Sequence, residues 1–298
     1  MLAPFLLMTL TRKSGCKINL LLNILGKRAD GFHELETVLQ PVPLSDELSF
    51  ARAGTGVQLT CNVPELPTDA NNLVVRAAEA FLEAAAIREG VKLHLEKRIP
   101  VAAGLGGGSG NAAATLLGLN ELFGGPLSAE QLHRLAATLG SDVPFFLQDK
   151  PAIATGRGER VTPVEPFSAL RGASVLLIHP GFGISTAWAY QQLARFPASL
   201  SGTQGRADKL VALLRNPDLR AAGNAFYNSL EAPALHKYPL LALFQELLRD
   251  EGAAAVLMSG SGSTTFALTE SSGKSNALKE RFVTKFGPSS WIVEVSLG

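Results

Sequence analysis

The stretch PVAAGLGGGSGNAAATLLGLN, residues 100–120, constrains the fold more than any other part of the chain. Before it, residues 91–95 alternate between apolar and polar as in a half-buried strand, and the alanine-rich run after the glycines favours a helix. Glycine lets backbone N–H groups point in unusual directions and lets a ligand approach the main chain. The unpaired N–H groups at the start of a helix favour an anion, most often phosphate. The stretch therefore predicts a strand, a phosphate-binding loop and a helix in that order.

A tight turn with close helix packing is the plainer interpretation of these glycines, because small residues let elements approach each other. That interpretation accounts for one or two glycines. The loop has five between positions 104 and 110, and each costs up to about 1 kcal/mol relative to alanine. Phosphate binding is the better explanation of such a cost.

Spacing excludes three better-known nucleotide motifs. The pattern GxGxxG fails because its last position is Ser109 when counted from Gly104 and Asn111 when counted from Gly106. SSGKS, residues 271–275, resembles the end of a Walker A motif, but Leu268 stands where the first glycine belongs. The HRD and DFG motifs of protein kinases are also absent from the sequence.

Composition favours a globular protein that acts on a small molecule. A length of 298 residues predicts two domains. With 27 Lys and Arg against 26 Asp and Glu, the net charge of +1 supplies no broad field for nucleic acid, so any anion must be bound locally. Two cysteines form neither a disulfide framework nor a metal cluster, as is usual in a reducing cytoplasm.

The N-terminal residues MLAPFLLMTLTRKSG carry their basic residues after the apolar run, the reverse of a signal peptide, and Met8 is an equally simple start. No run in the sequence approaches the roughly 20 apolar residues of a membrane span. We therefore expect a cytoplasmic protein with no nucleic-acid partner, no membrane partner and no dedicated metal cluster. The oligomeric state is left open.

The order of the expected elements is mixed α+β, without the regular alternation of a doubly wound sheet. Thr68 or Asp69 is expected to cap the turn before the first helix, and Ser128 with Gln131 forms a capping-box pattern. The Gly/Pro-rich segment 154–166 is the expected domain boundary. Strands are expected in 16–25, 35–51 (broken at its prolines), 56–63, 91–95, 173–181 and on both sides of a turn in 253–269, and helices in 72–87, 111–120, 128–140 and much of 185–248.

Four blocks of the sequence, in order, carry a resemblance to a known family. The blocks are KINLLLNILGKRADGFHELETVLQ, GLGGGSGNAA, GSDVPFF and MSGSGSTTF, which together span residues 17–266. Pro100, Gly104, Leu105 and Gly106 match the PxxxGLGSS loop of the GHMP kinase superfamily, which includes galactokinase, homoserine kinase and mevalonate kinase. Within it, the blocks resemble the family of kinases that phosphorylate 4-diphosphocytidyl-2-C-methyl-D-erythritol at its 2-hydroxyl, in non-mevalonate isoprenoid synthesis.

The resemblance implies a two-domain α+β fold. Its N-terminal half, residues 1–160, would bind ATP and resemble ribosomal protein S5 domain 2, and its C-terminal half, 161–298, would be ferredoxin-like and serve the substrate side. It also implies ATP and Mg²⁺ as the cofactors. The implied phosphate cradle comprises Pro100, Val101, Ala102, Ala103, Gly104, Leu105, Gly106, Gly107, Gly108, Ser109 and Gly110.

The resemblance further implies a catalytic pair, Lys17 and Asp142. A carboxylate can take the proton of the acceptor alcohol, while an ammonium group beside both lowers the pKa of the alcohol. The resemblance places Asn72 and Lys97 near the adenine, and it places Asn19, Phe32, His33 and Thr186 on the side of the cytidyl substrate. Without it, Asp142 is a turn or cap residue and Lys17 a charge at a strand edge.

The sequence departs from the family pattern at a few positions. Gly110 stands where a second serine is usual, Phe32 replaces a tyrosine, and Gly15 and Cys16 replace a common proline and alanine. These departures affect substrate affinity more than the reaction. Two alternatives remain open at this point: another small-molecule kinase of the superfamily, of the homoserine or mevalonate type, and a non-catalytic binding protein of the same fold.

Overall fold

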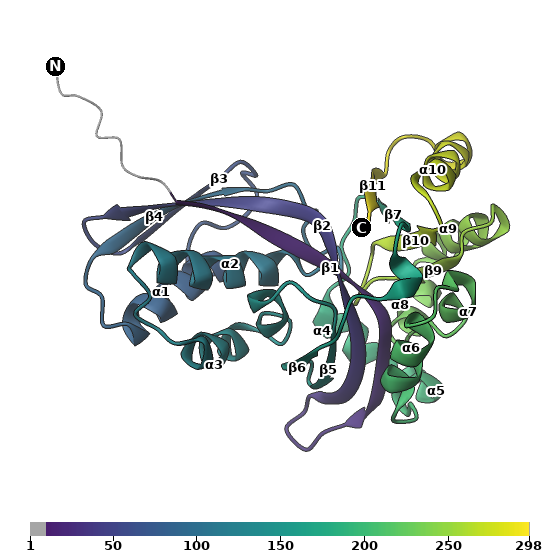
Figure 1. Cartoon of the computed structure of the whole chain (residues 1–298), viewed down its shortest axis with the longest axis horizontal. Helices are drawn as coiled ribbons and strands as arrows, with labels where there is room; N and C mark the ends of the chain where they lie inside the picture. The colour runs from purple at the N-terminus through teal and green to yellow at the C-terminus, as the bar shows by residue number, and fades with distance from the viewer. Residues whose placement is uncertain (1–9, 298) are drawn as a thin grey trace. The chain divides into compact units, whose positions relative to one another are not determined.

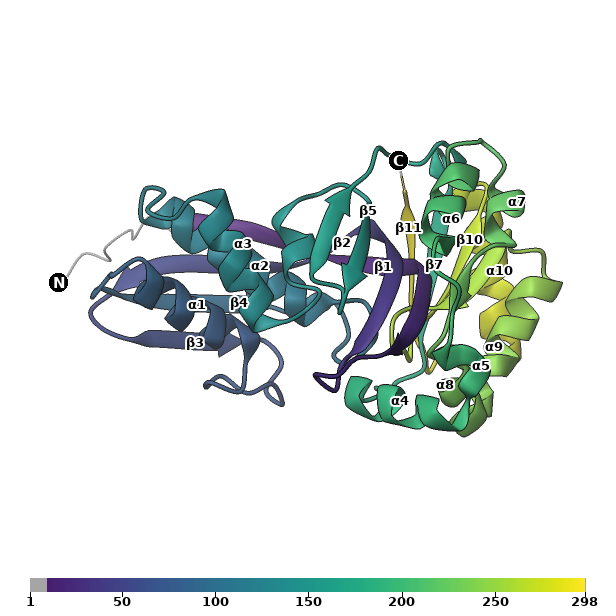
Figure 2. The same ribbon diagram turned by 90° about the horizontal axis from the view of Figure 1, so that it is seen from below.

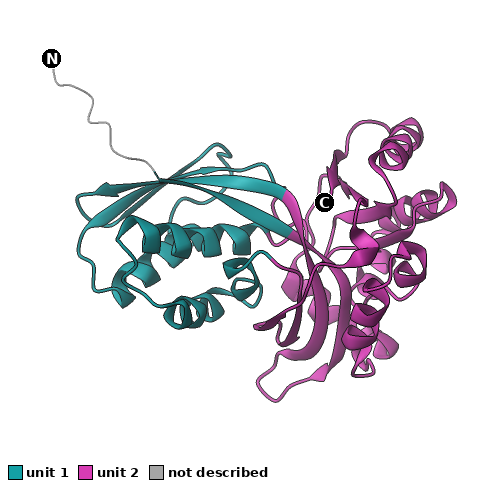
Figure 3. Ribbon diagram, in the orientation of Figure 1, with its two compact units in different colours: residues 1–16, 44–99, 107–149 teal, residues 17–43, 100–106, 150–298 magenta. Residues whose placement is uncertain are grey.

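A computed structural model describes residues 10–297 and divides the chain into two compact units, which are coloured separately in Figure 3. Unit 1 consists of Met1–Cys16, Leu44–Ile99 and Gly107–Asp149, and unit 2 of Lys17–Pro43, Pro100–Gly106 and Lys150–Gly298. The chain thus passes between the units several times, inside two long strands and within the glycine-rich segment. The division into halves 1–160 and 161–298 stays a prediction. The expectation that the first residues are not a signal peptide concerns positions 1–15, most of which lie outside the described residues.

Unit 1 is a sheet with helices packed on one of its faces, as Figures 1 and 2 show. The last part of β2 (His33–Ala53) pairs antiparallel with β4 (Gly90–Glu96), which places Phe50 opposite Leu93, and β3 (Val57–Cys61) pairs parallel with β4. Its elements are the first part of β1 (Leu10–Lys27), the last part of β2 (His33–Ala53), β3 (Val57–Cys61), α1 (Leu73–Ala84), β4 (Gly90–Glu96), α2 (Gly107–Leu122), α3 (Ala129–Leu139) and the 3₁₀ turn η1 (Pro144–Leu147).

The core of unit 1 lies between this sheet and the helices. Phe50 and Leu93 point from the sheet into a cluster that includes Phe81 of α1 and Leu116 of α2, all fully or almost fully buried. Small residues let α2 come close to the sheet: a Cβ added at Gly118 would lie 2.4 Å from the Phe50 ring. The alanine- and glycine-rich composition of α2 therefore has a packing role as well as a role at its N-terminus.

Unit 2 contains a four-stranded sheet whose strands are arranged in the order β11 (Trp291–Ser296), β7 (Ser174–His179), β10 (Thr265–Thr269), β9 (Ala255–Met258), with each neighbouring pair antiparallel. When these four strands are numbered 1 to 4 along the chain, their spatial order is 4-1-3-2, as in a ferredoxin-like sheet. Figure 2 shows α9 (Pro239–Asp250) and α10 (Ser272–Phe286) beside this sheet, and their Phe244 and Phe282 pack edge to face with ring centroids 4.6 Å apart.

The remaining strands of unit 2 belong to a seven-stranded sheet that also contains β1, β2, β3 and β4. In it, the first part of β2 pairs with β5 (Ala152–Gly156), and β1 pairs parallel with β8 (Tyr227–Asn228). The elements of unit 2 outside β1 and β2 are β5 (Ala152–Gly156), β6 (Arg160–Pro163), η2 (Ser168–Leu170), β7 (Ser174–His179), α4 (Thr186–Gln192), η3 (Leu193–Arg195), α5 (Pro197–Leu200), α6 (Arg206–Leu214), α7 (Leu219–Gly223), β8 (Tyr227–Asn228), α8 (Glu231–Lys237), α9 (Pro239–Asp250), β9 (Ala255–Met258), β10 (Thr265–Thr269), α10 (Ser272–Phe286) and β11 (Trp291–Ser296).

Most expected elements are present, and the α+β class is confirmed. The capping box of Ser128 and Gln131 starts α3 as expected. One expectation was wrong: β2 runs unbroken through Pro41 and Pro43. In the turn before α1, Asp69 Oδ1 accepts from Asn71 N–H at 2.9 Å, as expected, and Asn72 caps the helix itself. The segment 154–166 holds the β5–β6 hairpin, in which β5 also pairs with β2, and its place as the domain boundary stays a prediction.

None of the helices between residues 10 and 297 has the length and apolar content that a membrane span requires.

Candidate active site

The glycine-rich loop adopts a backbone that depends on glycine. Gly104 and Gly106 have φ angles of +78° and +71°, in the left-handed region where other residues are strained. A Cβ added at Gly104 would lie 2.0 Å from the carbonyl oxygen of Ser259. Glycine at 104 is therefore required by the turn and by close packing within unit 2.

The start of α2 is suited to an anion. Its first turn, Gly107–Gly110, contains no acidic residue, and Gly108 is exposed. A Cβ added at Gly108 would meet only Leu73 Cδ1, at 3.8 Å, so open space lies beside the backbone there. Exposed N–H groups at the positive end of the helix dipole fit the phosphates of ATP.

Lys17 is a buried cation of unit 2, with a residue exposure of 3%. Its Nζ donates to Asn19 Oδ1 at 2.6 Å and to the carbonyl oxygen of Gly104 at 2.9 Å. Its backbone N–H donates to the carbonyl oxygen of Leu105 at 2.9 Å. The structure therefore brings together three of the residues expected from the sequence, Lys17, Asn19 and Gly104, on β1 and the loop.

The second glycine-rich turn, residues 258–264, packs on this loop. Ser259 Oγ donates to the carbonyl oxygen of Gly104 at 2.9 Å, and Thr264 N–H donates to that of Ala103 at 3.1 Å. A Cβ added at Gly260 would lie 3.1 Å from Lys17 Nζ. Asn228 Nδ2 holds the turn by donating to the carbonyl oxygens of Met258 and Gly260. The glycine at position 260 thus lets a turn from the C-terminal part of the chain come close to Lys17.

Phe32 and His33 lie at the turn that joins β1 to β2. The ring of Phe32 is 52% exposed and has the Arg157 guanidinium 4.8 Å from its centroid. The His33 ring lies 5.1 Å from that of Tyr190 on α4. Burial, with the Lys27 charge as a smaller cause, lowers the pKa of His33 below its usual value of 6.5. A neutral imidazole has one donor and one acceptor, which suits the polar edge of a base.

Thr186 is the first residue of α4, and its Oγ1 lies 2.9 Å from Ser261 Oγ. This contact joins the start of α4 to the same glycine-rich turn that contacts Lys17. Unit 2 therefore holds Lys17, Asn19, Phe32, His33, Thr186 and the loop residues Pro100–Gly106.

Unit 1 holds the other expected residues. Asp142 follows α3 and is half-buried. Asn72 uses its side chain to cap α1: its Oδ1 accepts from Val74 N–H at 2.9 Å, and its Nδ2 donates to the carbonyl oxygen of Pro67. Lys97 Nζ forms a buried ion pair with Asp46 at 2.5 Å. Asn72 and Lys97 are thus already engaged within unit 1.

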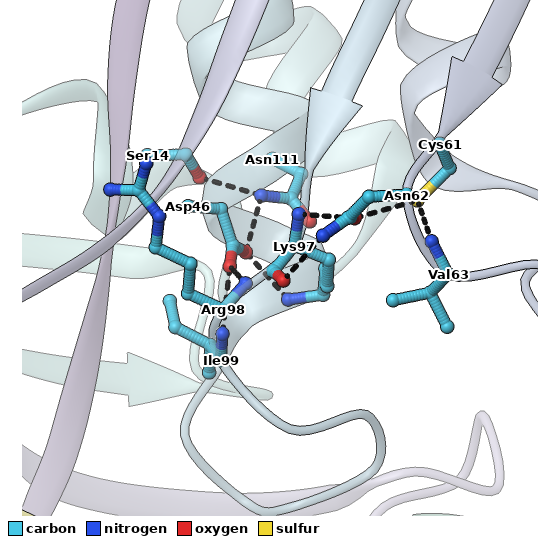
Figure 4. A network of polar contacts seen from close by, with 9 residues as sticks. All are labelled: Ser14, Asp46, Cys61, Asn62, Val63, Lys97, Arg98, Ile99 and Asn111. Carbon is cyan, nitrogen blue, oxygen red and sulfur yellow. Dashed lines mark hydrogen bonds and ion pairs between the residues drawn. The ribbon is translucent and has the colours of Figure 1, made fainter.

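Figure 4 shows the network around Lys97, which the sequence did not reveal. Asp46, Asn111 and Ser14 join Lys97 there, and Asn111 Nδ2 donates to both Asp46 Oδ2 and Ser14 Oγ at 2.9 Å. Asp46 lies in PLSDELSF, where a single carboxylate within a strand carries no motif. The sequence offered one sign that Asp46 is buried: it occupies a position where the alternating pattern of this strand otherwise places apolar residues, such as Leu48 and Phe50.

Comparison with known proteins identifies the chain. The family described as GHMP kinases N terminal domain matches residues 72–150, and GHMP kinases C terminal matches 210–289. A 4-diphosphocytidyl-2-C-methyl-D-erythritol kinase from Synechococcus sp. (strain JA-3-3Ab) is 39% identical over 293 residues, which cover 93% of this chain and 94% of that protein. The chain belongs to this family of GHMP kinases. A kinase of the same name from Syntrophotalea carbinolica is also 39% identical, over 93% of this chain and 96% of that protein.

Solved structures agree with the membership in the GHMP kinase family. A crystal structure of 4-(cytidine 5'-diphospho)-2C-methyl-D-erythritol kinase matches with a TM-score of 0.79 and 34% identity, covering 97% of this chain and all of that one. Homoserine kinase from Cytophaga hutchinsonii matches with a TM-score of 0.74 at 19% identity, which shows a shared fold alone. The GHMP kinase fold expected from the sequence is therefore confirmed.

Proposed function

We propose that this GHMP kinase transfers the terminal phosphoryl group of ATP to the 2-hydroxyl of 4-diphosphocytidyl-2-C-methyl-D-erythritol, a step of non-mevalonate isoprenoid precursor synthesis. The observation that carries the proposal is the match to kinases of that name at 39% identity over nearly their whole length. A fold alone would not support a substrate, since one fold hosts many activities. Here the similarity extends over 93% of this chain, and the match to the N-terminal family domain, residues 72–150, includes the glycine-rich loop.

In the proposed reaction, the backbone of Pro100–Gly110 and the start of α2 hold the phosphates of ATP. Phosphoryl transfer needs positioning and charge neutralisation more than covalent chemistry from the protein. Mg²⁺ would supply part of that neutralisation when bound. No group of three His, Cys, Asp or Glu side chains within residues 10–297 could hold a metal ion by itself. Mg²⁺ commonly keeps water and phosphate oxygens as ligands.

Lys17 and Asp142 are the proposed catalytic pair. Asp142 would accept the proton of the acceptor hydroxyl or orient that hydroxyl toward ATP. Lys17 Nζ has a fixed position because Asn19 and the Gly104 carbonyl oxygen both accept from it. An ammonium group held in this way favours the developing negative charge on the alcohol oxygen.

Phe32, His33, Asn19 and Thr186 are the proposed contacts of the cytidyl substrate. An exposed ring at Phe32 can stack on the flat face of cytosine. A neutral His33 can donate to one polar atom of the base edge and accept from another. We also propose the cytoplasm as the compartment, because two cysteines in 298 residues are too few for a disulfide framework.

A coupled assay tests the proposal. Purified protein with ATP and Mg²⁺ is given 4-diphosphocytidyl-2-C-methyl-D-erythritol, homoserine or mevalonate, and ADP release is followed. We expect turnover with the cytidyl substrate alone. Turnover with homoserine or mevalonate only would reassign the substrate, and no ADP release with any acceptor would favour a non-catalytic binding protein. Omitting Mg²⁺ from the active reaction is expected to abolish turnover.

A further inference from the structure

Asp46 is a fully buried carboxylate that accepts four hydrogen bonds. Oδ1 accepts from the backbone N–H groups of Arg98 and Ile99, at 2.7 and 2.8 Å. Oδ2 accepts from Lys97 Nζ at 2.5 Å and from Asn111 Nδ2 at 2.9 Å. All of these residues belong to unit 1, and Figure 4 shows them converging on the one carboxylate.

The two oxygens of Asp46 contact opposite ends of the glycine-rich loop. Arg98 and Ile99 directly precede Pro100, where the loop begins. Asn111 lies in α2, just after the last loop glycine. A single side chain from β2 therefore ties the chain before the loop to the chain after it.

The packing of Gly107 closes the base of the loop in the same place. A Cβ added there would lie 3.0 Å from Lys97 Nζ and 3.1 Å from Ile99 Cγ2. The first residue of α2 thus sits against the last residue before the loop. The loop residues 100–106 therefore leave and return to nearly the same point, between Ile99 and Gly107.

The charge of the network is balanced internally. Asp46 and Lys97 are both buried and neutralise each other at 2.5 Å, so Lys97 in this arrangement is committed to the carboxylate. A buried ion pair is weak support for a purely stabilising role, because desolvation offsets much of the Coulomb attraction. The geometry instead suits a role in specifying the position of the loop ends.

We propose that Asp46 is a positioning residue for ATP: it fixes both ends of the glycine-rich loop so that the phosphate-binding backbone is preformed. This inference rests on the proposed function, in which that backbone binds ATP. A loop whose ends are free loses more conformational entropy on binding, and this loss weakens affinity. Loosening the ends is therefore expected to weaken ATP binding while the acceptor substrate binds as before.

Two variants test the inference. Asn111→Ala removes the tie between Asp46 and α2 while leaving the ion pair with Lys97. Asp46→Asn replaces one acceptor oxygen by an amide nitrogen, which faces two donors in either orientation of the amide, and so disrupts the tie more severely. We expect each variant to weaken ATP binding in calorimetry by about tenfold, the size associated with losing one hydrogen bond to a buried charged group. The KM of the acceptor substrate is expected to stay unchanged.

Glu36→Gln is the matched control. Glu36 is also a buried carboxylate that accepts from two backbone N–H groups, those of Gly205 and Arg206, but it lies in unit 2. Its replacement is expected to lower stability without changing the Kd for ATP. Equal weakening by Glu36→Gln would show that ATP affinity reports general loosening, and would overturn the inference.

Hydrogen exchange separates positioning from overall stability and needs no ligand. In Asn111→Ala we expect faster exchange at the N–H groups of residues 98–99 and 107–111, with α1 and α3 unchanged. Uniformly faster exchange, or unchanged exchange and ATP affinity in a folded variant, would overturn the inference. If the unaltered protein binds no ATP, the proposed function fails, whereas the exchange result still decides whether Asp46 fixes the loop ends.

Discussion

At the scale of single residues, Lys17 shows how a charge can be buried and still be useful. An ammonium group removed from water is costly unless hydrogen bonds replace its hydration. Asn19 Oδ1 and the Gly104 carbonyl oxygen supply such bonds at 2.6 and 2.9 Å, and Asn19 is in turn held by donating to Thr37 Oγ1 at 2.9 Å. The cation is therefore fixed before any substrate binds, which reduces the reorganisation that a reaction requires.

Asp142→Asn tests the other member of the proposed catalytic pair. The amide cannot accept a proton, so we expect kcat to fall by about 10²-fold or more while the Kd for ATP changes little. Steady-state kinetics and ATP titration make the measurement. Asp149→Asn is the control, since Asp149 is an exposed carboxylate nearby in sequence and its loss should leave turnover intact. Full turnover by Asp142→Asn would exclude this residue as the base.

At the scale of elements, the packing of α2 against β1 accounts for the departure from the family pattern at Gly110. A Cβ at this position would lie 2.4 Å from the carbonyl oxygen of Gly15 and 3.1 Å from Ser14 Oγ. The backbone of β1 thus occupies the space that the usual serine would need. The missing hydroxyl is a consequence of close approach between a helix and a strand.

Restoring the serine is therefore expected to harm the protein. Gly110→Ser gains a few tenths of a kcal/mol in helix propensity, but overpacking against β1 costs about 1–3 kcal/mol, so the net effect is a loss of stability. Denaturant unfolding measures it. Gly108→Ser is the control for stability, because the nearest atom to its added Cβ is Leu73 Cδ1 at 3.8 Å. A gain of stability in Gly110→Ser would contradict the packing argument.

At the scale of the whole molecule, buried titratable groups make stability depend on pH in opposite directions. Burial lowers the pKa of His179 below 6.5, so the stability it contributes is present above that value and is lost as pH falls toward its folded pKa. Burial is also the main cause that raises the pKa of Glu231 above 4.5. The stability that Glu231 contributes is present below 4.5 and is lost as pH rises from there toward its folded pKa. His33 acts in the same direction as His179.

His179→Gln isolates one of these contributions. Between pH 7.5 and 5.5 we expect the free energy of unfolding to fall more steeply in the unaltered protein than in the variant, by at most about 1.4 kcal/mol per pH unit. Urea unfolding at both pH values provides the comparison. His236→Gln, which replaces an exposed histidine, is the control for the substitution itself. Parallel slopes in His179→Gln and the unaltered protein would refute the assignment.

Local patterns in the sequence determined the elements and the chemistry of the loop. The alternation in 91–95, the five glycines and the alanine run predicted β4, the loop and α2, because strand period, glycine freedom and helix propensity are all short-range properties. The same locality explains the error at Pro41 and Pro43, where pairing with β5 and β4 on either side maintains β2 as one strand. Resemblance to the family, and not periodicity, singled out Lys17 and Asp142.

Only the tertiary structure decided which distant residues meet. Asp46 lies 51 positions before Lys97 and 65 before Asn111, and nothing in PLSDELSF predicts that its aspartate accepts from both ends of the glycine-rich loop. The contact of Ser259 with Gly104 likewise joins positions 155 residues apart. Hydrogen bonds and close packing act over a few ångströms in space regardless of sequence separation, so their partners are set by how the elements fold together. The loop could be predicted from its own residues, whereas the contacts from Asp46 and Ser259 that hold it in place could not.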